Sequence, residues 1–541
     1  MSATTVRSVG LVGEVTAAWG LKAPPEVVIA WNDGEAIFAD GFRDGPLVAS
    51  QVRPLERLTI GPWSLPLAVN QYTGGPPDWP ARWMYGLTQS VNTVLWLHVF
   101  LGGLLLFLVH RFLRFHGSDI AAGIAALALA TDWNFVFYKK VLGGTEILLQ
   151  TALLLAIWAL WSRRWSGGKH GSTAIAIGIG LGLLAKATFI PTLIAFGLVV
   201  VATRKDRPSI QAPDPVSVAP MLGIIGLLTA PLWIAWLHHG FSVPQSPHVV
   251  SHDFVGLQLD RAWTGLFQDG PARENPASLW WFLSSPMGWF DVAYQCKSTS
   301  IFPWRSLGWV VCILGSVLAW RDDTESRPRA LLRFVSLFAP LQLLLLWLAN
   351  KDLHHLAQAA VPTAIWLGLS ADRLAATISP PRSPRRAFYC LILATPWFIG
   401  GSQALYQTDK TLQGTPVHTF TWNGQHQLGK MLQEHAIEHV WTSDYDLYGM
   451  LEMWAPNTRV THGWGDLSQR SSDRSAALDD LLKGAKGAHY LVVRKSAPMI
   501  YNHAPSEARL REAEERTGLT IQEIAALEDQ KGKWARLYRV D

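Results

Sequence analysis

A short acidic stretch near the amino end of the chain holds the side chains best suited to chemistry. Asp33 and Glu35 lie two residues apart in the run 31–40, between Trp31 and Phe38. Aromatic walls that keep water away raise the basicity of a carboxylate, which can then act as a general base towards a hydroxyl group. A solvated turn is the alternative interpretation, because Asp-Gly is ordinary turn chemistry. Asp40, the last residue of this stretch, and Asp44, just after it, are alternative bases.

Cations that could hold an anionic ligand follow further along the chain. Lys139 and Lys140 precede a glycine pair and Glu146, at the junction of two apolar runs. Lys186 stands alone at the end of the glycine-rich run 180–186. We predict a phosphate partner for these lysines and a second acidic site at Glu146. The alternatives are lysines that only snorkel or anchor at an interface and a glutamate that favours a helix start.

Two further groups add histidine and aromatic side chains. His354 and His355 begin a late apolar run and could donate hydrogen bonds to an oxyanion. Adjacent histidines point in different directions, which argues against a two-histidine metal site, so no metal ligand is assigned. A polar loop over 238–304 combines basic and aromatic residues that suit a sugar face and a phosphate, among them Arg261, Trp263 and Trp289.

The composition indicates which class of protein positions these groups. Of 541 residues 49% are hydrophobic, only 16% are charged and 27 are Trp. A soluble protein carries about 25% charged residues, whereas Trp is enriched at both membrane interfaces. The net charge of +5 is spread over loops and does not indicate nucleic-acid binding. Three cysteines form no readable disulfide framework or thiolate metal site. The chain is therefore predicted to be a polytopic α-helical membrane protein.

The predicted membrane domain covers 88–405 and contains about ten apolar spans. We expect them at 88–110, 119–137, 143–161, 172–188, 189–203, 218–237, 305–320, 334–349, 353–370 and 387–405. Before them, 1–87 has no run long enough to cross a bilayer and is predicted to form an outer-face acidic loop and short amphipathic interface pieces. No signal peptide is apparent, so a first span upstream of Met1 is expected to be missing from this chain.

Basic residues in the loops predict the orientation. One set of connections between spans carries sixteen Lys and Arg and the opposite set carries seven, so the richer set is predicted to be cytoplasmic. The sixteen are Arg111, Arg114, Arg163, Arg164, Lys169, Arg204, Lys205, Arg207, Arg321, Arg327, Arg329, Arg333, Arg373, Arg382, Arg385 and Arg386. This orientation puts the acidic loop, the loop 238–304 and the carboxyl-terminal tail together on the periplasmic or extracytoplasmic face of the plasma (inner) membrane.

The tail over 406–541 is polar and is predicted to form a soluble α/β domain. Strands are expected at 440–443, 458–461 and 490–493, and amphipathic helices at 425–437, 473–486 and 505–517. The strands look buried on both faces, which favours a partly parallel sheet.

Taken in order, these features resemble the GT-C superfamily of membrane glycosyltransferases, in particular bacterial relatives of protein mannosyltransferases and aminoarabinose transferases. The likeness is carried by the acidic loop, the Gln71–Gly75 segment with Tyr72, the 140–146 connection, the 180–186 run and the His354-His355 pair. It covers about 27–370. Family members usually place the two acidic residues side by side, whereas Gly34 separates them here.

This resemblance implies an inverting glycosyltransferase with a polyprenyl-phosphate sugar donor, acting in the cell envelope or in protein glycosylation. It implies Asp33 as general base and Glu35 as its helper. Lys139, Lys140, Lys186, His354 and His355 would contact the donor phosphate. Membrane lipids and a hydroxyl acceptor would be the other partners, and divalent metal dependence, sugar and acceptor stay open.

Three alternatives compete with this interpretation. A lipid-sugar ligase of the O-antigen type would concentrate its working residues in the 238–304 loop. A transporter would favour ionisable residues in mid-span and internal repeats, and the spans carry few charges. A non-enzymatic assembly protein would not need Asp33.

Overall fold

The structure is a computed structural model of the whole chain. It describes residues 56–60, 63–70, 73–80, 91–136, 143–166, 171–186, 189–203, 215–239, 304–322, 326–350, 353–380, 383–414, 422–442, 455, 457–462, 474–493, 505–529 and 532–541.

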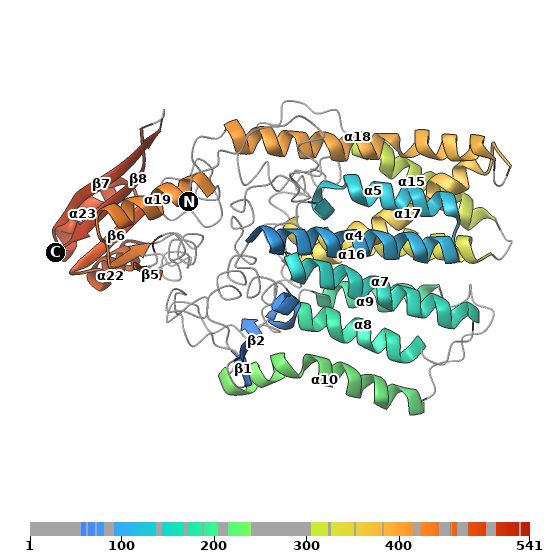
Figure 1. Ribbon diagram of the computed structural model, residues 1–541, viewed down its shortest axis with the longest axis horizontal. Coiled ribbons are helices and arrows are strands. Elements are labelled where there is room, and N and C mark those ends of the chain that lie inside the picture. Colours follow the sequence, from blue (N-terminus) through green and yellow to red (C-terminus); the bar gives the residue numbers. More distant parts are fainter. Residues whose placement is uncertain are drawn as a thin grey trace.

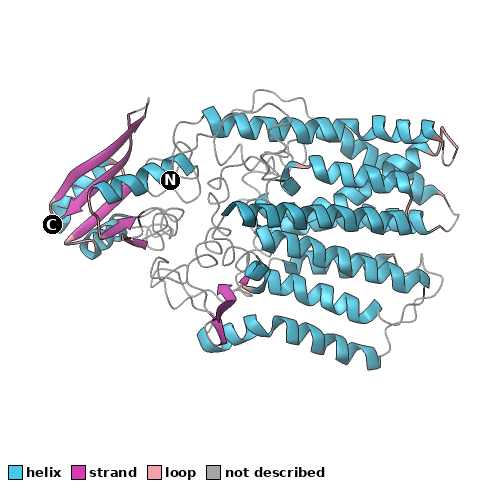
Figure 2. Cartoon of the chain, in the orientation of Figure 1, coloured by secondary structure: helices cyan, strands magenta, loops and turns pink. Residues whose placement is uncertain are grey.

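Long helices lying side by side form the main body of the molecule (Figures 1 and 2). They are α4 (Val91–His116), α5 (Asp119–Thr131), α7 (Gly143–Ser166), α8 (Gly171–Ala185), α9 (Ile190–Ala202), α10 (Pro215–His239), α15 (Trp304–Arg321), α16 (Arg327–Asn350), α17 (Ala360–Ala375) and α18 (Pro384–Gly414), with the 3-10 helix η5 (Leu353–Ala359) before α17. Each predicted apolar span overlaps one of these helices in its described residues, and the ninth overlaps η5 and α17 together.

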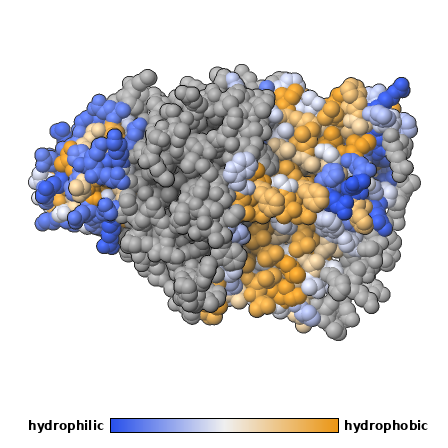
Figure 3. Space-filling view, viewed as in Figure 1, coloured by the Kyte–Doolittle hydropathy of each residue, from blue (hydrophilic) through white to orange (hydrophobic). Residues whose placement is uncertain are grey.

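These helices form because an apolar chain in a bilayer must satisfy its backbone groups internally. Within the described ranges, three segments are long and apolar enough to cross a membrane: Trp96–His116, Arg327–Leu348 and Pro384–Tyr406. Several helices, such as α5, are apolar but shorter. Hydrophobic residues gather in a band over the helical body, as Figure 3 shows. The predicted fold class, a polytopic helical membrane protein, is confirmed.

Aromatic side chains and buried polar pairs hold the helices together. Phe334 of α16 packs edge-on against Trp161 of α7, with ring centroids 5.0 Å apart. Ser118 caps α5 by accepting the Ala121 N–H at 3.0 Å, and its hydroxyl donates to Asp372 of α17 at 2.7 Å. A single side chain thus caps the start of α5 and joins it to α17.

A small antiparallel sheet precedes α4. It consists of β1 (Glu56–Ile60), β2 (Trp63–Asn70) and β3 (Thr73–Gly74), in that order, followed by the 3-10 helix η2 (Pro76–Asp78). These strands lie in the 1–87 segment, for which the membrane-interface role stays a prediction. Their buried Ala68 packs with Leu232 of α10, so the sheet is attached to the helical body.

The carboxyl-terminal domain has a five-stranded mixed sheet in the order β5-β4-β6-β8-β7. Its strands are β4 (His439–Thr442), β5 (Arg459–His462), β6 (Ala488–Val493), β7 (Ile521–Asp529) and β8 (Gly532–Val540). β4 is parallel to β5 and to β6, and β8 is antiparallel to β6 and β7. Helices α19 (Trp422–Glu434), α22 (Arg474–Gly484) and α23 (Glu507–Thr517) pack on it. The predicted α/β character is confirmed, and the β7–β8 hairpin is an addition.

Successive helices alternate in direction, so the body has two distinct ends. We call the end where α7 begins and α8 finishes the site end, and the end where α15 finishes and α16 begins the basic end. The small sheet and the carboxyl-terminal domain both lie at the site end in Figure 1.

Candidate active site

Two oppositely charged groups predicted for the site lie at the site end, both buried. Glu146 is in the first turn of α7 and is 1% exposed. Lys186 follows the last residue of α8 and is 2% exposed. A carboxylate in a first turn is favoured by the helix dipole, but ionised groups are rarely buried without a role or a partner. Their burial makes them the strongest described candidates for chemistry.

The glycine-rich run explains how Lys186 is positioned. The Lys186 N–H donates to the carbonyl of Gly182 at 3.1 Å, and the Lys186 carbonyl accepts from Phe189 at 3.0 Å, so the lysine stands in the tight connection between α8 and α9. The Phe189 ring occupies the space beside Gly182, where a Cβ would lie 2.2 Å from Cε1. Only glycine lets the chain turn back so closely.

The small sheet packs against the same helix end. A Cβ on Gly74 of β3 would lie 2.2 Å from the carbonyl oxygen of Leu184, two residues before Lys186. The Gly75 N–H donates to Leu67 of β2 at 2.9 Å, which holds the following turn in place. The structure therefore brings the Gly-Gly segment named by the resemblance next to the end of the 180–186 run.

An uncharged hydrogen-bond network holds η5 at this end. Gln150 of α7, one turn beyond Glu146, donates to the carbonyl of Ala357 at 2.8 Å. Gln342 of α16 donates to Thr192 at 3.1 Å, and Thr192 donates to Gln358 at 3.3 Å. All four side chains in this network are at most 1% exposed. The network ties η5, which contains His354 and His355, to α7, α9 and α16; the side chains of the two histidines lie outside the description.

This network was not predicted, because the candidate site residues were chosen for their charge, imidazole or aromatic ring and not for an uncharged amide. Its signal was present in the sequence, since Gln150, Gln342 and Gln358 interrupt otherwise apolar runs. A buried amide must be hydrogen-bonded, and such residues therefore mark contacts between helices.

A buried ion pair at the site end was also missed. Arg305 in α15 binds Asp132 at 2.9 Å, and both side chains are 4% exposed. The other carboxylate oxygen of Asp132 accepts the Phe135 N–H at 3.0 Å, and the guanidinium lies 4.3 Å from the centre of the Trp397 ring. The pair joins the end of α5, which leads to Lys139 and Lys140, to the start of α15, which follows the 238–304 loop.

The other predicted residues lie outside the part of the chain that the structure describes. These are Asp33, Glu35, Tyr72, Lys139, Lys140, Arg261, Trp263 and Trp289. Within the described part, no group of His, Cys, Asp or Glu has an arrangement that could hold a metal ion. Of the predicted set, the structure thus brings Glu146, Lys186 and the backbone of the histidine pair to one end.

Comparison with solved structures identifies the fold. ArnT from Cupriavidus metallidurans, in a crystal structure bound to undecaprenyl phosphate, matches with a TM-score of 0.53 at 11% sequence identity, over 97% of this chain and 97% of that one. The chain has the GT-C fold. The GT-C resemblance seen in the sequence is thereby confirmed at the level of fold.

Other comparisons add less. The Archaeoglobus fulgidus oligosaccharyltransferase, tethered to an acceptor peptide, matches with a TM-score of 0.47 at 14% identity, over 97% of this chain and 74% of that one. A TM-score below 0.5 does not establish a common fold, so the GT-C assignment rests on ArnT. No protein-family model and no curated protein sequence matches the chain.

Proposed function

We propose that the protein is a membrane glycosyltransferase that moves a sugar from a polyprenyl-phosphate donor to a hydroxyl acceptor. The observation that carries the proposal is the buried Lys186 at the site end, two residues after the contact of Leu184 with Gly74 of β3 and at the same end as buried Glu146. The GT-C fold supports it, because ArnT binds a lipid phosphate, undecaprenyl phosphate. A buried cation suits such a phosphate.

The reaction divides the work between a base and cations. Asp33 takes the proton of the acceptor hydroxyl while the hydroxyl oxygen bonds to the anomeric carbon of the sugar. Glu35 orients the acceptor. The bond from that carbon to the phosphate oxygen breaks on the opposite face, which inverts the configuration. The electron pair stays on the leaving phosphate, whose charge grows by one.

Cations stabilise this growing charge, as electrostatic preorganisation requires. In the proposal Lys186 is aided by Lys139, Lys140 and the histidine pair. Glu146 serves as the second acidic site, and the side chains assigned to sugar and acceptor binding are Tyr72, Arg261, Trp263 and Trp289. A lipid phosphate is a fair leaving group already, so no general acid is needed. The site then faces the periplasmic or extracytoplasmic side of the plasma membrane.

The test is sugar release from radiolabelled polyprenyl-phosphate donors by purified protein in lipid. Asp33→Asn should lower kcat by about a hundredfold or more, the range for loss of a general base. Lys186→Gln should lower it by about a hundredfold, and Lys186→Arg by less, because the charge is kept. Lys430→Gln is the matched control, since Lys430 is 66% exposed on α19.

Each outcome has a definite meaning. Turnover that survives Asp33→Asn would move the base to Glu35 or Asp40. An equal loss in Lys186→Gln and Lys430→Gln would remove Lys186 from the site. Absence of turnover with every donor would refute the glycosyltransferase proposal and favour the transport or assembly alternatives.

A further inference from the structure

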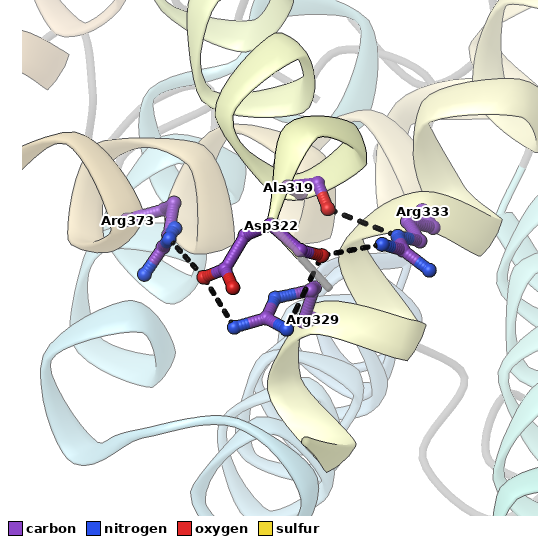
Figure 4. Close-up of polar contacts among 5 residues, drawn as sticks. All are labelled: Ala319, Asp322, Arg329, Arg333 and Arg373. Atoms are coloured by element: carbon purple, nitrogen blue, oxygen red, sulfur yellow. Dashed lines mark hydrogen bonds and ion pairs between the residues drawn. The ribbon is translucent and has the colours of Figure 1, made fainter. Parts of the chain in front are cut away.

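Arginines gather around the last residues of α15, as Figure 4 shows. They lie at the basic end of the helical body. The carboxylate of Asp322 accepts hydrogen bonds from Arg329 of α16 and from Arg373 of α17. Arg333 of α16 instead donates to backbone carbonyls, to Ala319 at 2.9 Å and to Asp322 at 2.7 Å. We call Arg329, Arg333 and Arg373 the arginine cluster.

The arginine cluster and the residues next to it in the sequence hold more positive than negative charge. Carbonyl oxygens accept hydrogen bonds but bring no net charge, whereas the Asp322 carboxylate brings one negative charge. Residues 321–333 hold four arginines, and Arg373 of α17 is a fifth. Against these five stand the three carboxylates of the same segment, Asp322, Asp323 and Glu325. Two positive charges remain even when all three carboxylates are counted, and an anion at this end would be attracted.

An exposed apolar surface begins beside Arg333. Its guanidinium carbon lies 5.2 Å from the centre of the Trp320 ring, and the Trp320 indole N–H donates to Ser336 at 3.2 Å. Trp320 is 44% exposed. From this contact, α15 and α16 expose a strip of large apolar side chains that leads away from the basic end, formed by Leu314, Val317, Leu337 and Leu344.

The positive charge and the apolar strip beside it are together complementary to one class of ligand. A phospholipid has an anionic head above apolar chains, and tryptophan is enriched at the level where the two meet. Guanidinium groups suit phosphate oxygens because their donors form a planar fork. We propose that the α15–α16 surface binds an anionic phospholipid, its phosphate at Arg333 and Trp320 and its acyl chains along the apolar strip. The proposal does not depend on the transferase function.

The test measures lipid retention by the purified full chain in native mass spectrometry. Phosphatidylglycerol and phosphatidylcholine with the same acyl chains are compared. Arg333→Gln should reduce bound phosphatidylglycerol by about fivefold, as expected for one arginine near a membrane surface. It should leave the small phosphatidylcholine signal unchanged. Arg333→Lys should reduce binding by less than Arg333→Gln, since lysine preserves the charge but not the planar fork.

Arg114→Gln is the matched control, because it removes the same charge from the basic end. Arg114 is 57% exposed and pairs with Asp119 at 2.8 Å, on α4 and not on the α15–α16 surface. It should change binding by less than about twofold. Equal losses in both variants would mean diffuse surface charge and would overturn the proposal. Displacement of the lipid by equimolar inorganic phosphate would also overturn it, in favour of a free-phosphate site.

A measurement on the unaltered protein avoids any folding defect of the variants. Phosphatidylglycerol with a photoreactive group in its acyl chain should label peptides from Trp304–Arg321 and Arg327–Asn350 preferentially. Labelling spread evenly over all apolar helices would refute a defined site.

Discussion

Breaking the buried pair between Arg305 and Asp132 should destabilise the helical body strongly. In Arg305→Gln the Asp132 carboxylate keeps its contact with the Phe135 N–H but loses its ionic partner at 2.9 Å. Both side chains are 4% exposed, so little solvent screens the remaining charge. Removing one partner of such a pair costs about 3–5 kcal/mol. For a cooperative unit of about 300 residues this corresponds to a fall in Tm of about 5–8 °C.

The thermal unfolding of each variant can be followed through its buried thiols. Cys312 and Cys390 are free and buried, and a thiol-reactive dye reports their exposure as the protein unfolds on heating in detergent. Cys296→Ser in every sample removes the third cysteine. The control is Arg114→Gln, whose ion pair is exposed on both sides and should shift Tm by about 1 °C or less.

A double variant separates the ion pair from general damage. Asp132→Asn combined with Arg305→Gln leaves no unpaired buried charge, so it should recover at least half of the loss seen in Arg305→Gln alone. The reasoning is refuted if Arg305→Gln matches the exposed control. It is also refuted if the double variant loses the sum of the two single losses, since the two side chains would then act independently.

Two further predictions concern the small sheet and the carboxyl-terminal domain. Gly74→Ala should lower the free energy of unfolding by about 1–3 kcal/mol and reduce donor turnover, because the new Cβ would lie 2.2 Å from the Leu184 carbonyl oxygen. Gly103→Ala is the control and should change neither quantity, because the space around its Cβ is open. Equal effects of the two substitutions would contradict this packing. Burial foremost lowers the pKa of His439 from its ordinary value of 6.5, so the unfolded state binds that proton more tightly. The carboxyl-terminal domain should therefore lose stability as pH falls below about 6.5, and the loss should be smaller in His439→Gln. Thermal unfolding followed by circular dichroism at pH 7.5 and 5.5 measures the loss. A Tm that does not change with pH would contradict the prediction.

Much of the fold was predictable because the membrane leaves the backbone few choices. A run of apolar residues in lipid must be helical. The predicted spans 143–161 and 305–320 therefore correspond to α7 and α15, whose ends differ from the predicted ones by a few residues. In the carboxyl-terminal domain, buried strand patterns located β4, β5 and β6. The β7–β8 hairpin was not predicted, since it lies beyond the segments assigned from pattern.

The candidate site was predictable only in part. Lys186 and Glu146 could be selected because ionisable residues beside apolar spans are unusual. The roles of Asp33 and Glu35 stay predictions, as these residues lie outside the described ranges. Gln150 and Asp132 were missed because a single polar residue in an apolar run does not show which distant group it will contact.

The sequence by itself determined where the helices run, which residues between them are charged, and that the tail is an α/β domain, because these depend on local pattern. Tertiary structure alone decided which polar groups meet. Gln150 reaches Ala357 across 207 residues, and Ser118 reaches Asp372 across 254. Such pairs depend on which helices pack side by side, and that follows from the fit of whole surfaces and the closure of long loops, which no local pattern encodes.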